Sequence, residues 1–175
     1  IQPLSSDSPG EGLHPYSAFT ASVCQLRPES RGSIVPKSPD PVVYPAIHPN
    51  YLATRTDRET IVAGMRLSRR LAATKALSPY VAEELRPGPQ AVTDADLLQN
   101  ARDTSATIYH PAGTCKMGPD GDPMAVLDPR LRVRGVGGLR VVDCSAMPTL
   151  TSGNTNAPVI MMAEKASDMI LEDAR

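Results

Sequence analysis

The sequence lacks several features that mark particular classes of protein. It has no tryptophan and one phenylalanine, so little aromatic material is present for a cage around a cationic ligand. Its three cysteines are widely spaced without a C-x-x-C pair, so we expect reduced thiols and no metal site. No apolar run approaches the roughly 20 residues of a membrane-spanning helix, and the N-terminal residues have neither the basic start nor the apolar stretch of a signal peptide. We therefore expect a cytoplasmic protein with no membrane span.

The sequence also has no excess of positive or of negative charge. The chain has 18 Lys plus Arg against 19 Asp plus Glu, for a formal net charge of −1. No basic stripe is interleaved with aromatic residues, so we expect no nucleic-acid partner. With 175 residues, of which 41% are hydrophobic, the composition is ordinary for a globular fold. The chain begins with Ile1 rather than Met, which suggests a piece of a longer protein.

The N-terminal third predicts a β-hairpin that follows a loose segment. Residues 1–15 are rich in Ser, Pro and Gly and are expected to be flexible, so the folded domain should span residues 16–175. Alternating apolar residues predict a strand over 17–25, and a short β-branched run predicts a returning strand over 33–36. Residues 38–50 should form a loop.

Two capping boxes predict the next helices. Thr56 with Glu59 predicts a helix over roughly 57–74, and Thr93 with Asp96 predicts a second helix that ends near Asp103.

The C-terminal third predicts two strands and a final helix. Residues 131–134 and 139–143 alternate in polarity around a glycine-rich turn. The final helix has apolar residues at 3.6-residue spacing, Pro158 as its expected first residue and Asn156 as its expected cap. Strands and helices are mixed rather than alternating, so an α+β fold is favoured over a doubly wound α/β fold.

Each of the three histidines precedes a proline, which favours extended backbone, so His14, His48 and His110 should lie on loops or strand ends. An ordinary structural or solvated role is open to all three. His110 differs in its surroundings, because residues 109–118 form a glycine-bounded loop. Residues 152–158 are also unusual, since small polar residues lead into the final helix, whose N-terminus offers unpaired N–H groups.

Five segments together resemble the C-terminal signature of the glucose–methanol–choline (GMC) family of flavin-dependent oxidoreductases, especially its choline dehydrogenase-like branch. They occur in family order and span nearly the whole chain beyond residue 15. The segments are Leu-Arg-Pro-Glu-Ser-Arg-Gly (26–32), Tyr-Pro-Ala-Ile-His-Pro-Asn-Tyr-Leu (44–52), Tyr-His-Pro-Ala-Gly-Thr-Cys-Lys-Met-Gly (109–118), Leu-Arg-Val-Val-Asp-Cys-Ser (139–145) and Gly-Asn-Thr-Asn-Ala-Pro (153–158).

The resemblance implies a substrate-binding domain built on an antiparallel sheet with flanking helices, and segments that complete an FAD-binding domain absent from this sequence. It implies that His110 is the active-site histidine beside the alcohol and that Asn154 is the second active-site residue. The residues it implies as FAD contacts are Asp143, Cys144, Thr155 and Asn156.

The implied reaction is oxidation of a small alcohol, with His110 as general base and Asn154 as a hydrogen-bond donor to the developing alkoxide. The partner would be an N-terminal FAD-binding domain of the same protein, since this sequence has no G-x-G-x-x-G fingerprint. The chain alone is then expected to lose FAD and to be inactive. Two alternatives remain: a non-catalytic fragment or ligand-binding module without FAD, and a thiolate reaction at Cys115.

Overall fold

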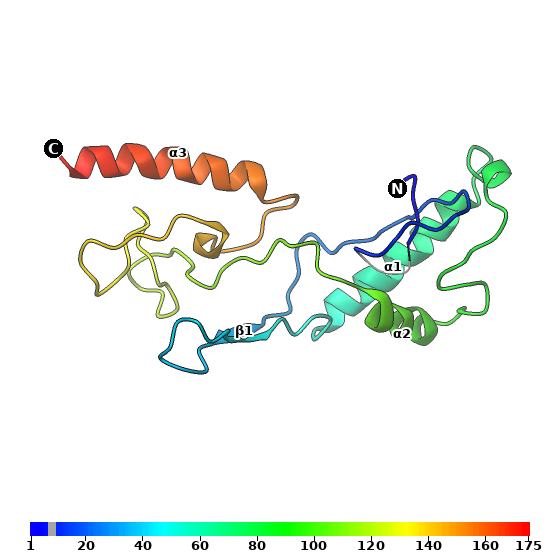
Figure 1. Ribbon diagram of the computed structural model, residues 1–175, viewed down its shortest axis with the longest axis horizontal. Coiled ribbons are helices and arrows are strands. Elements are labelled where there is room, and N and C mark those ends of the chain that lie inside the picture. The colour runs from blue at the N-terminus through cyan, green and yellow to red at the C-terminus, as the bar shows by residue number, and fades with distance from the viewer. Residues whose placement is uncertain (7–9) are drawn as a thin grey trace. The chain divides into compact units, whose positions relative to one another are not determined.

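The computed structural model describes residues 1–6 and 10–175. Within these residues it contains three α-helices, two short 3₁₀ helices and a two-stranded sheet (Figure 1). No helix in the described part of the chain is both long enough and apolar enough to cross a membrane. The chain divides into two compact units, which consist of residues 1–31 with 50–106 and residues 32–49 with 107–175.

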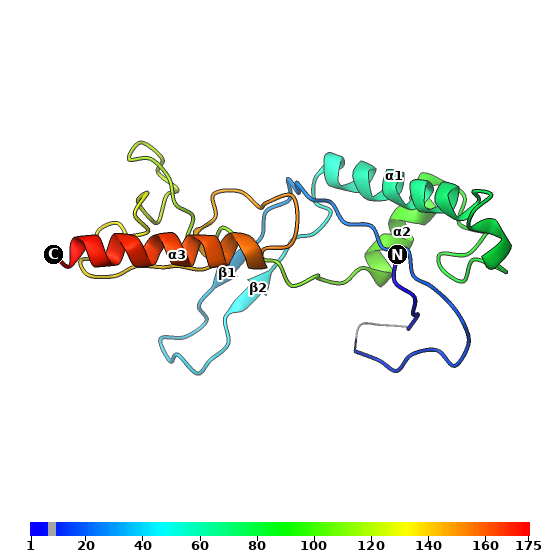
Figure 2. The same cartoon turned by 90° about the horizontal axis from the view of Figure 1, so that it is seen from above.

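The first unit is built on two helices, α1 (Arg55–Ala72) and α2 (Asp94–Thr104), which pack against each other (Figure 2). A short 3₁₀ helix, η1 (Ser78–Tyr80), lies in the connection between them. Because both helices are amphipathic, each turns its apolar side toward the other. The buried residues of this core are Val62, Ala91 and Leu97.

The predicted start of α2 is confirmed, while the predicted start of α1 is wrong. Thr93 and Asp96 form the expected reciprocal capping box at α2. At α1 the cap is Thr54 rather than Thr56, and its hydroxyl accepts from the Asp57 amide at 3.2 Å. The loop residue Ser30 holds this start, because its hydroxyl accepts from Thr54 N at 3.3 Å and its amide donates to the Asp57 carboxylate at 2.8 Å.

The strand predicted over residues 17–25 is not formed. This segment lies along α1 and is held by side chains: Gln25 Nε2 donates to Thr60 Oγ1 at 3.2 Å. Val23 packs so closely on Gly64 that a Cβ atom there would lie 2.2 Å from a Val23 methyl carbon. Packing on a helix has therefore replaced the strand pairing that alternation alone suggested.

The flexible segment predicted over residues 1–15 includes residues 7–9, which lie outside the described residues. Nearby, Gln2 forms an isolated antiparallel bridge with Thr20. The division at residue 15 therefore stays a prediction.

The second unit contains the sheet, in which β1 (Ser33–Val35) pairs antiparallel with β2 (Ala46–His48). The strand predicted over 33–36 is confirmed, but its partner comes from the region 38–50 that was predicted as loop. Gly32 explains the close pairing, because a Cβ atom there would lie 2.2 Å from the carbonyl oxygen of the last residue of β2.

The final helix, α3 (Asn156–Asp173), covers the main core of the second unit (Figure 1). Its cap is Thr155 rather than the predicted Asn156, and Pro158 is its third residue rather than its first. The observed antiparallel sheet and helices confirm the predicted α+β class. The buried residues of this core are Leu127, Leu131, Ala146, Met147, Met162 and Ala166.

The two strands predicted over 131–134 and 139–143 pair only partly. Val133 N donates to the Leu139 carbonyl at 2.9 Å, and a single isolated β-bridge joins Arg132 to Arg140. The turn between them uses glycines in left-handed backbone, so the segments reverse direction over a very short distance. A few hydrogen bonds of this kind do not make a regular strand.

Candidate functional site

The backbone around His110 is held in an unusual conformation. Tyr109, the residue before it, has a positive φ of 61°, which is uncommon for a residue other than glycine. The Tyr109 amide donates to Thr107 Oγ1 at 3.0 Å, which helps to hold this turn. Pro111 follows directly and restricts the backbone of His110 itself. The neighbours on both sides therefore restrict the backbone that carries the half-buried imidazole.

The loop that follows His110 is fastened to the segment around η2 (Cys144–Ala146). Cys115 N donates to the Ser145 carbonyl at 2.9 Å, and Met117 N donates to the Ala146 carbonyl at 2.9 Å. These bonds join two segments that the sequence analysis singled out separately.

The imidazole of His110 contacts the start of α3. Its Nδ1 lies 3.0 Å from the hydroxyl oxygen of Thr155. Thr155 is 5% exposed and is one of two buried polar residues in the described chain. The structure thus brings His110 into contact with Thr155, which the resemblance implied as an FAD contact and which is adjacent to Asn154.

Thr155 is the N-cap residue of α3, but its side chain does not cap the helix. A capping hydroxyl ordinarily accepts from the second or third helical amide. The third residue of α3 is Pro158, which has no amide hydrogen. Thr155 also has helical backbone angles (φ −85°, ψ −9°), whereas cap residues usually adopt extended ones. Its hydroxyl is consequently available to His110.

Asn154 and Asn156 flank Thr155 on the exposed side of this site. Neither amide side chain forms a hydrogen bond with any residue that the structure describes. The backbone amides of Asn156 and Ala157 are likewise unpaired in the described part of the chain. No direct contact joins Asn154 to His110 among the described residues, so their proximity follows from Thr155, which is adjacent to one and bonded to the other. Four polar groups at the start of α3 are therefore without a hydrogen-bond partner in the described part of the chain.

Asp143 and Cys144, the other implied cofactor contacts, have partners within the fold. The Asp143 carboxylate is exposed and accepts from Ser145 N at 2.7 Å, which caps η2. Cys144 is half-buried against the core of the second unit. Cys115 packs against the same core, and this placement gives no support to a thiolate reaction.

The other two histidines lie in different settings. His14 Nδ1 lies 2.9 Å from Ser5 Oγ, and its ring stacks on Tyr16 with a centroid separation of 4.9 Å. His48 is exposed at the end of β2. No group of three potential metal-ligating side chains occurs among the described residues.

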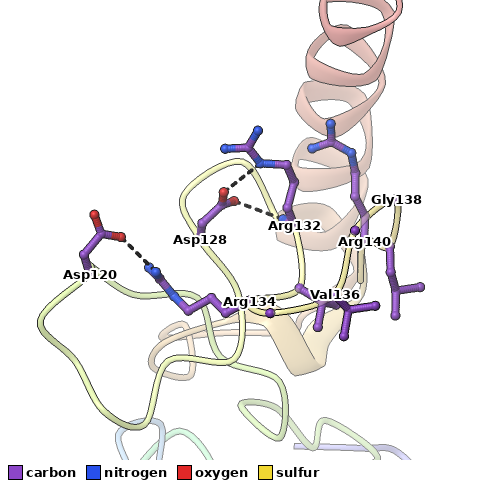
Figure 3. Close-up of a pocket in the computed structure, with 11 residues that line it drawn as sticks. Asp120, Asp128, Arg132, Arg134, Val136, Gly138 and Arg140 are labelled. Carbon is purple, nitrogen blue, oxygen red and sulfur yellow. Dashed lines mark hydrogen bonds and ion pairs between the residues drawn. The ribbon is translucent and has the colours of Figure 1, made fainter.

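A cavity of about 580 Å³ lies in the second unit around the glycine-rich turn (Figure 3). Its arginines are paired with carboxylates: Arg132 with Asp128 at 2.7 Å and Arg134 with Asp120 at 2.8 Å. None of the six predicted site residues is among those that line it. Since its charges are already neutralised, this cavity does not compete with His110 as the candidate site.

His110 was predicted from the sequence, but its bond to Thr155 was not. The sequence analysis gave Thr155 only as an implied FAD contact. A signal was present in the sequence, because a threonine three residues before a proline cannot cap that residue. The choice of His110 as the hydroxyl's partner depends on tertiary structure and has no local signal.

Comparisons with known proteins define the class. Residues 28–163 match the family model described as GMC oxidoreductase. The chain belongs to the GMC oxidoreductase family, as its resemblance predicted. It is 44% identical over 153 residues to an alcohol dehydrogenase [acceptor] of Pseudomonas putida, covering 87% of this chain and 27% of that protein.

Two further comparisons agree with this assignment. An oxygen-dependent choline dehydrogenase of Vibrio vulnificus is 44% identical over 162 residues, covering 93% of this chain and 29% of that protein. The structure of an FAD-dependent oxidoreductase from Chaetomium thermophilum superposes with a TM-score of 0.80 at 28% identity, covering 86% of this chain and 26% of the other. The chain thus spans about a quarter of the length of such relatives.

Proposed function

We propose that this chain is the substrate-side active-site domain of a longer FAD-dependent dehydrogenase or oxidase that acts on a small alcohol, as choline dehydrogenases do. The observation that carries the proposal is the bond between His110 and Thr155, which sets an imidazole beside the unpaired amides at the start of α3. The names of the relatives, which include alcohol and choline dehydrogenases, support the substrate class.

The donor groups at the start of α3 fit the carbonyl-rich edge of a flavin ring. Asn156 and Ala157 offer free backbone N–H groups, and the N-terminus of a helix carries about half a positive charge. Thr155 would contribute through its backbone N–H, since its hydroxyl is bonded to His110. The proposed FAD contacts are Asp143, Cys144, Thr155 and Asn156.

The proposed chemistry divides between two side chains. His110 Nε2, the nitrogen not bonded to Thr155, takes the proton of the substrate hydroxyl as general base. The Asn154 amide donates a hydrogen bond to the oxygen as negative charge develops on it. FAD, when bound, supplies the flavin N5 that accepts the hydride from the carbinol carbon. His110 and Asn154 therefore have to act on the same substrate oxygen.

Replacement of His110 by alanine in the longer protein tests the proposal. Turnover of an alcohol with an artificial electron acceptor should fall by roughly 10²–10⁴-fold, the contribution of a general base. His48→Ala is the matched control, because His48 is exposed and lies in the same unit. Asn154→Ala should cause a smaller loss.

Two outcomes would contradict the proposal. Unchanged turnover of the His110→Ala variant would show that His110 is not the general base. Loss of activity in Cys115→Ser with activity retained in His110→Ala would indicate a thiolate reaction instead.

A further inference from the structure

We propose that Thr155 is a positioning residue that selects the tautomer of His110 and fixes its ring orientation. The inference rests on the proposed function, because it concerns which imidazole nitrogen is free to receive the substrate proton. It begins from one contact, the 3.0 Å separation between Thr155 Oγ1 and His110 Nδ1.

The contact lies in a protected position. Thr155 is 5% exposed, so water has little access to compete for its hydroxyl. A buried polar group that loses its partner is costly, so this hydroxyl and the imidazole hold each other in place. A partner of this kind restricts both rotation and protonation of a histidine ring.

The hydroxyl is available because α3 does not use it. Pro158 removes the third helical amide, and the helical backbone angles of Thr155 differ from those of an ordinary cap. A local rule of helix capping is thus broken where a second segment of the chain approaches. Such departures are expected where function constrains a residue.

The inferred tautomer assigns a role to each nitrogen. His110 Nδ1 and Thr155 Oγ1 lie within hydrogen-bond distance, and in the inferred tautomer Nδ1–H donates to the hydroxyl, which leaves the lone pair of Nε2 free for the substrate proton. During proton transfer the substrate O–H bond breaks and an Nε2–H bond forms, while the Nδ1–H bond to Thr155 remains. Thr155 therefore acts through His110 and does not touch the reacting atoms.

The test uses Thr155→Val and Thr155→Ser in the longer protein with FAD bound. Valine keeps the branched shape but has no hydroxyl, whereas serine keeps the hydroxyl. Thr155→Val should lower kcat by roughly 10- to 100-fold, as loss of an orienting partner of a functional histidine does. KM for the alcohol and flavin absorbance should stay near the original values, and Thr155→Ser should restore most of kcat. Thr151→Val is the matched control, because the Thr151 hydroxyl bonds, among the described residues, to the nearby Gly153 carbonyl.

A second readout does not depend on turnover. The ¹⁵N chemical shifts of the His110 ring should show Nδ1 protonated and Nε2 bare in the original protein and in Thr155→Ser. Thr155→Val should show a mixture of the two neutral tautomers. An Nε2–H tautomer in the original protein would overturn the inference, as would full kcat in Thr155→Val.

The two proposals fail in different ways. If His110→Ala retains turnover, the proposed function fails whatever the tautomer is. If His110→Ala loses turnover while Thr155→Val keeps both kcat and the original ¹⁵N shifts, only the positioning role fails. Should Thr155→Val lose FAD, Thr155→Ala with the same ¹⁵N measurement decides the tautomer question.

Discussion

Asp57, near the start of α1, is a buried charged residue that is bonded to the loop of Glu29 and Ser30 and to the helix cap Thr54. It is 3% exposed, and its carboxylate accepts from Glu29 N at 3.0 Å, from Ser30 N at 2.8 Å and from the Ser30 hydroxyl. Burial alone would raise the pKa of Asp57, but the bonds from Ser30, Glu29 and Thr54 outweigh it and lower the pKa below its ordinary value. The charged form is therefore the one that holds the loop.

Asp57→Asn should destabilise the protein by roughly 1–3 kcal/mol at neutral pH, because hydrogen bonds to a charged acceptor are lost. A lowered native pKa contributes stability above the ordinary pKa of 3.8, and this stability is lost as pH falls below it. The difference from the original protein should thus shrink between about pH 6 and about pH 3 in urea unfolding. A constant difference would contradict the argument, and exposed Asp168→Asn is the control.

At the scale of single residues, the sequence could predict which residues are unusual but not which residues they contact. His110 was singled out from its loop, and the structure places it against α3. Its bond to Thr155 joins residues 45 apart, and Asp57 reaches Ser30 across 27. Contacts over such distances are set by packing, which no local pattern encodes.

At the scale of elements, the C-terminal end of α3 is held by two arginines. Arg130 Nη2 donates to the Met169 carbonyl at 3.0 Å and pairs with Asp173 at 2.8 Å, and Arg140 also pairs with Asp173. The pKa of Asp173 is lowered, first by its hydrogen bond from Arg140 and also by the charge of Arg130. Because cations at a helix C-terminus also favour its dipole, these contacts should resist fraying.

Arg130→Met should therefore loosen the last turn of α3 while leaving its first turn, which follows Thr155, intact. Hydrogen exchange should speed up at residues 169–173 and stay unchanged near residue 159. Roughly 1 M salt should have a similar effect on the original protein, since exposed ion pairs are screened. Uniformly faster exchange along α3 would show that the arginines support the whole helix instead.

Helices were predicted better than strands for a physical reason. The α2 capping box depends on residues three apart and was confirmed at Thr93 and Asp96. Strand pairing depends on partners distant in sequence, so residues 17–25 were assigned to a strand and 46–48 to a loop, both wrongly. A pattern within one segment cannot show whether a helix or a strand will lie beside it.

At the scale of the whole molecule, the chain leaves large apolar side chains exposed. Val42 is 81% exposed and Tyr44 is 83% exposed in the hairpin, and Ile160 and Met161 of α3 are 54% and 60% exposed. Apolar surface of this kind is usually covered by another part of a protein. This supports the proposal that the chain works as one portion of a longer enzyme, consistent with its quarter share of its relatives' length.

The chain by itself should not retain FAD. Much of the affinity for a dinucleotide comes from a glycine-rich turn that binds its pyrophosphate, and this sequence has no such fingerprint. The purified chain should be colourless near the flavin absorption bands, whereas the longer protein should be yellow. A stoichiometric yellow complex of the short chain with FAD would contradict this expectation. A colourless, inactive longer protein would favour the non-catalytic module.

Pro158 illustrates how a residue without a reactive group takes part in acid–base chemistry. With any other amino acid at that position, a second amide hydrogen would compete for the Thr155 oxygen, and the imidazole would share it. Since the Ala157 amide does not bond to this oxygen either, the missing hydrogen atom of Pro158 leaves the Thr155 hydroxyl to a ring in a separate segment. In the proposed enzyme, the orientation of the base therefore depends in part on a residue that has no reactive group.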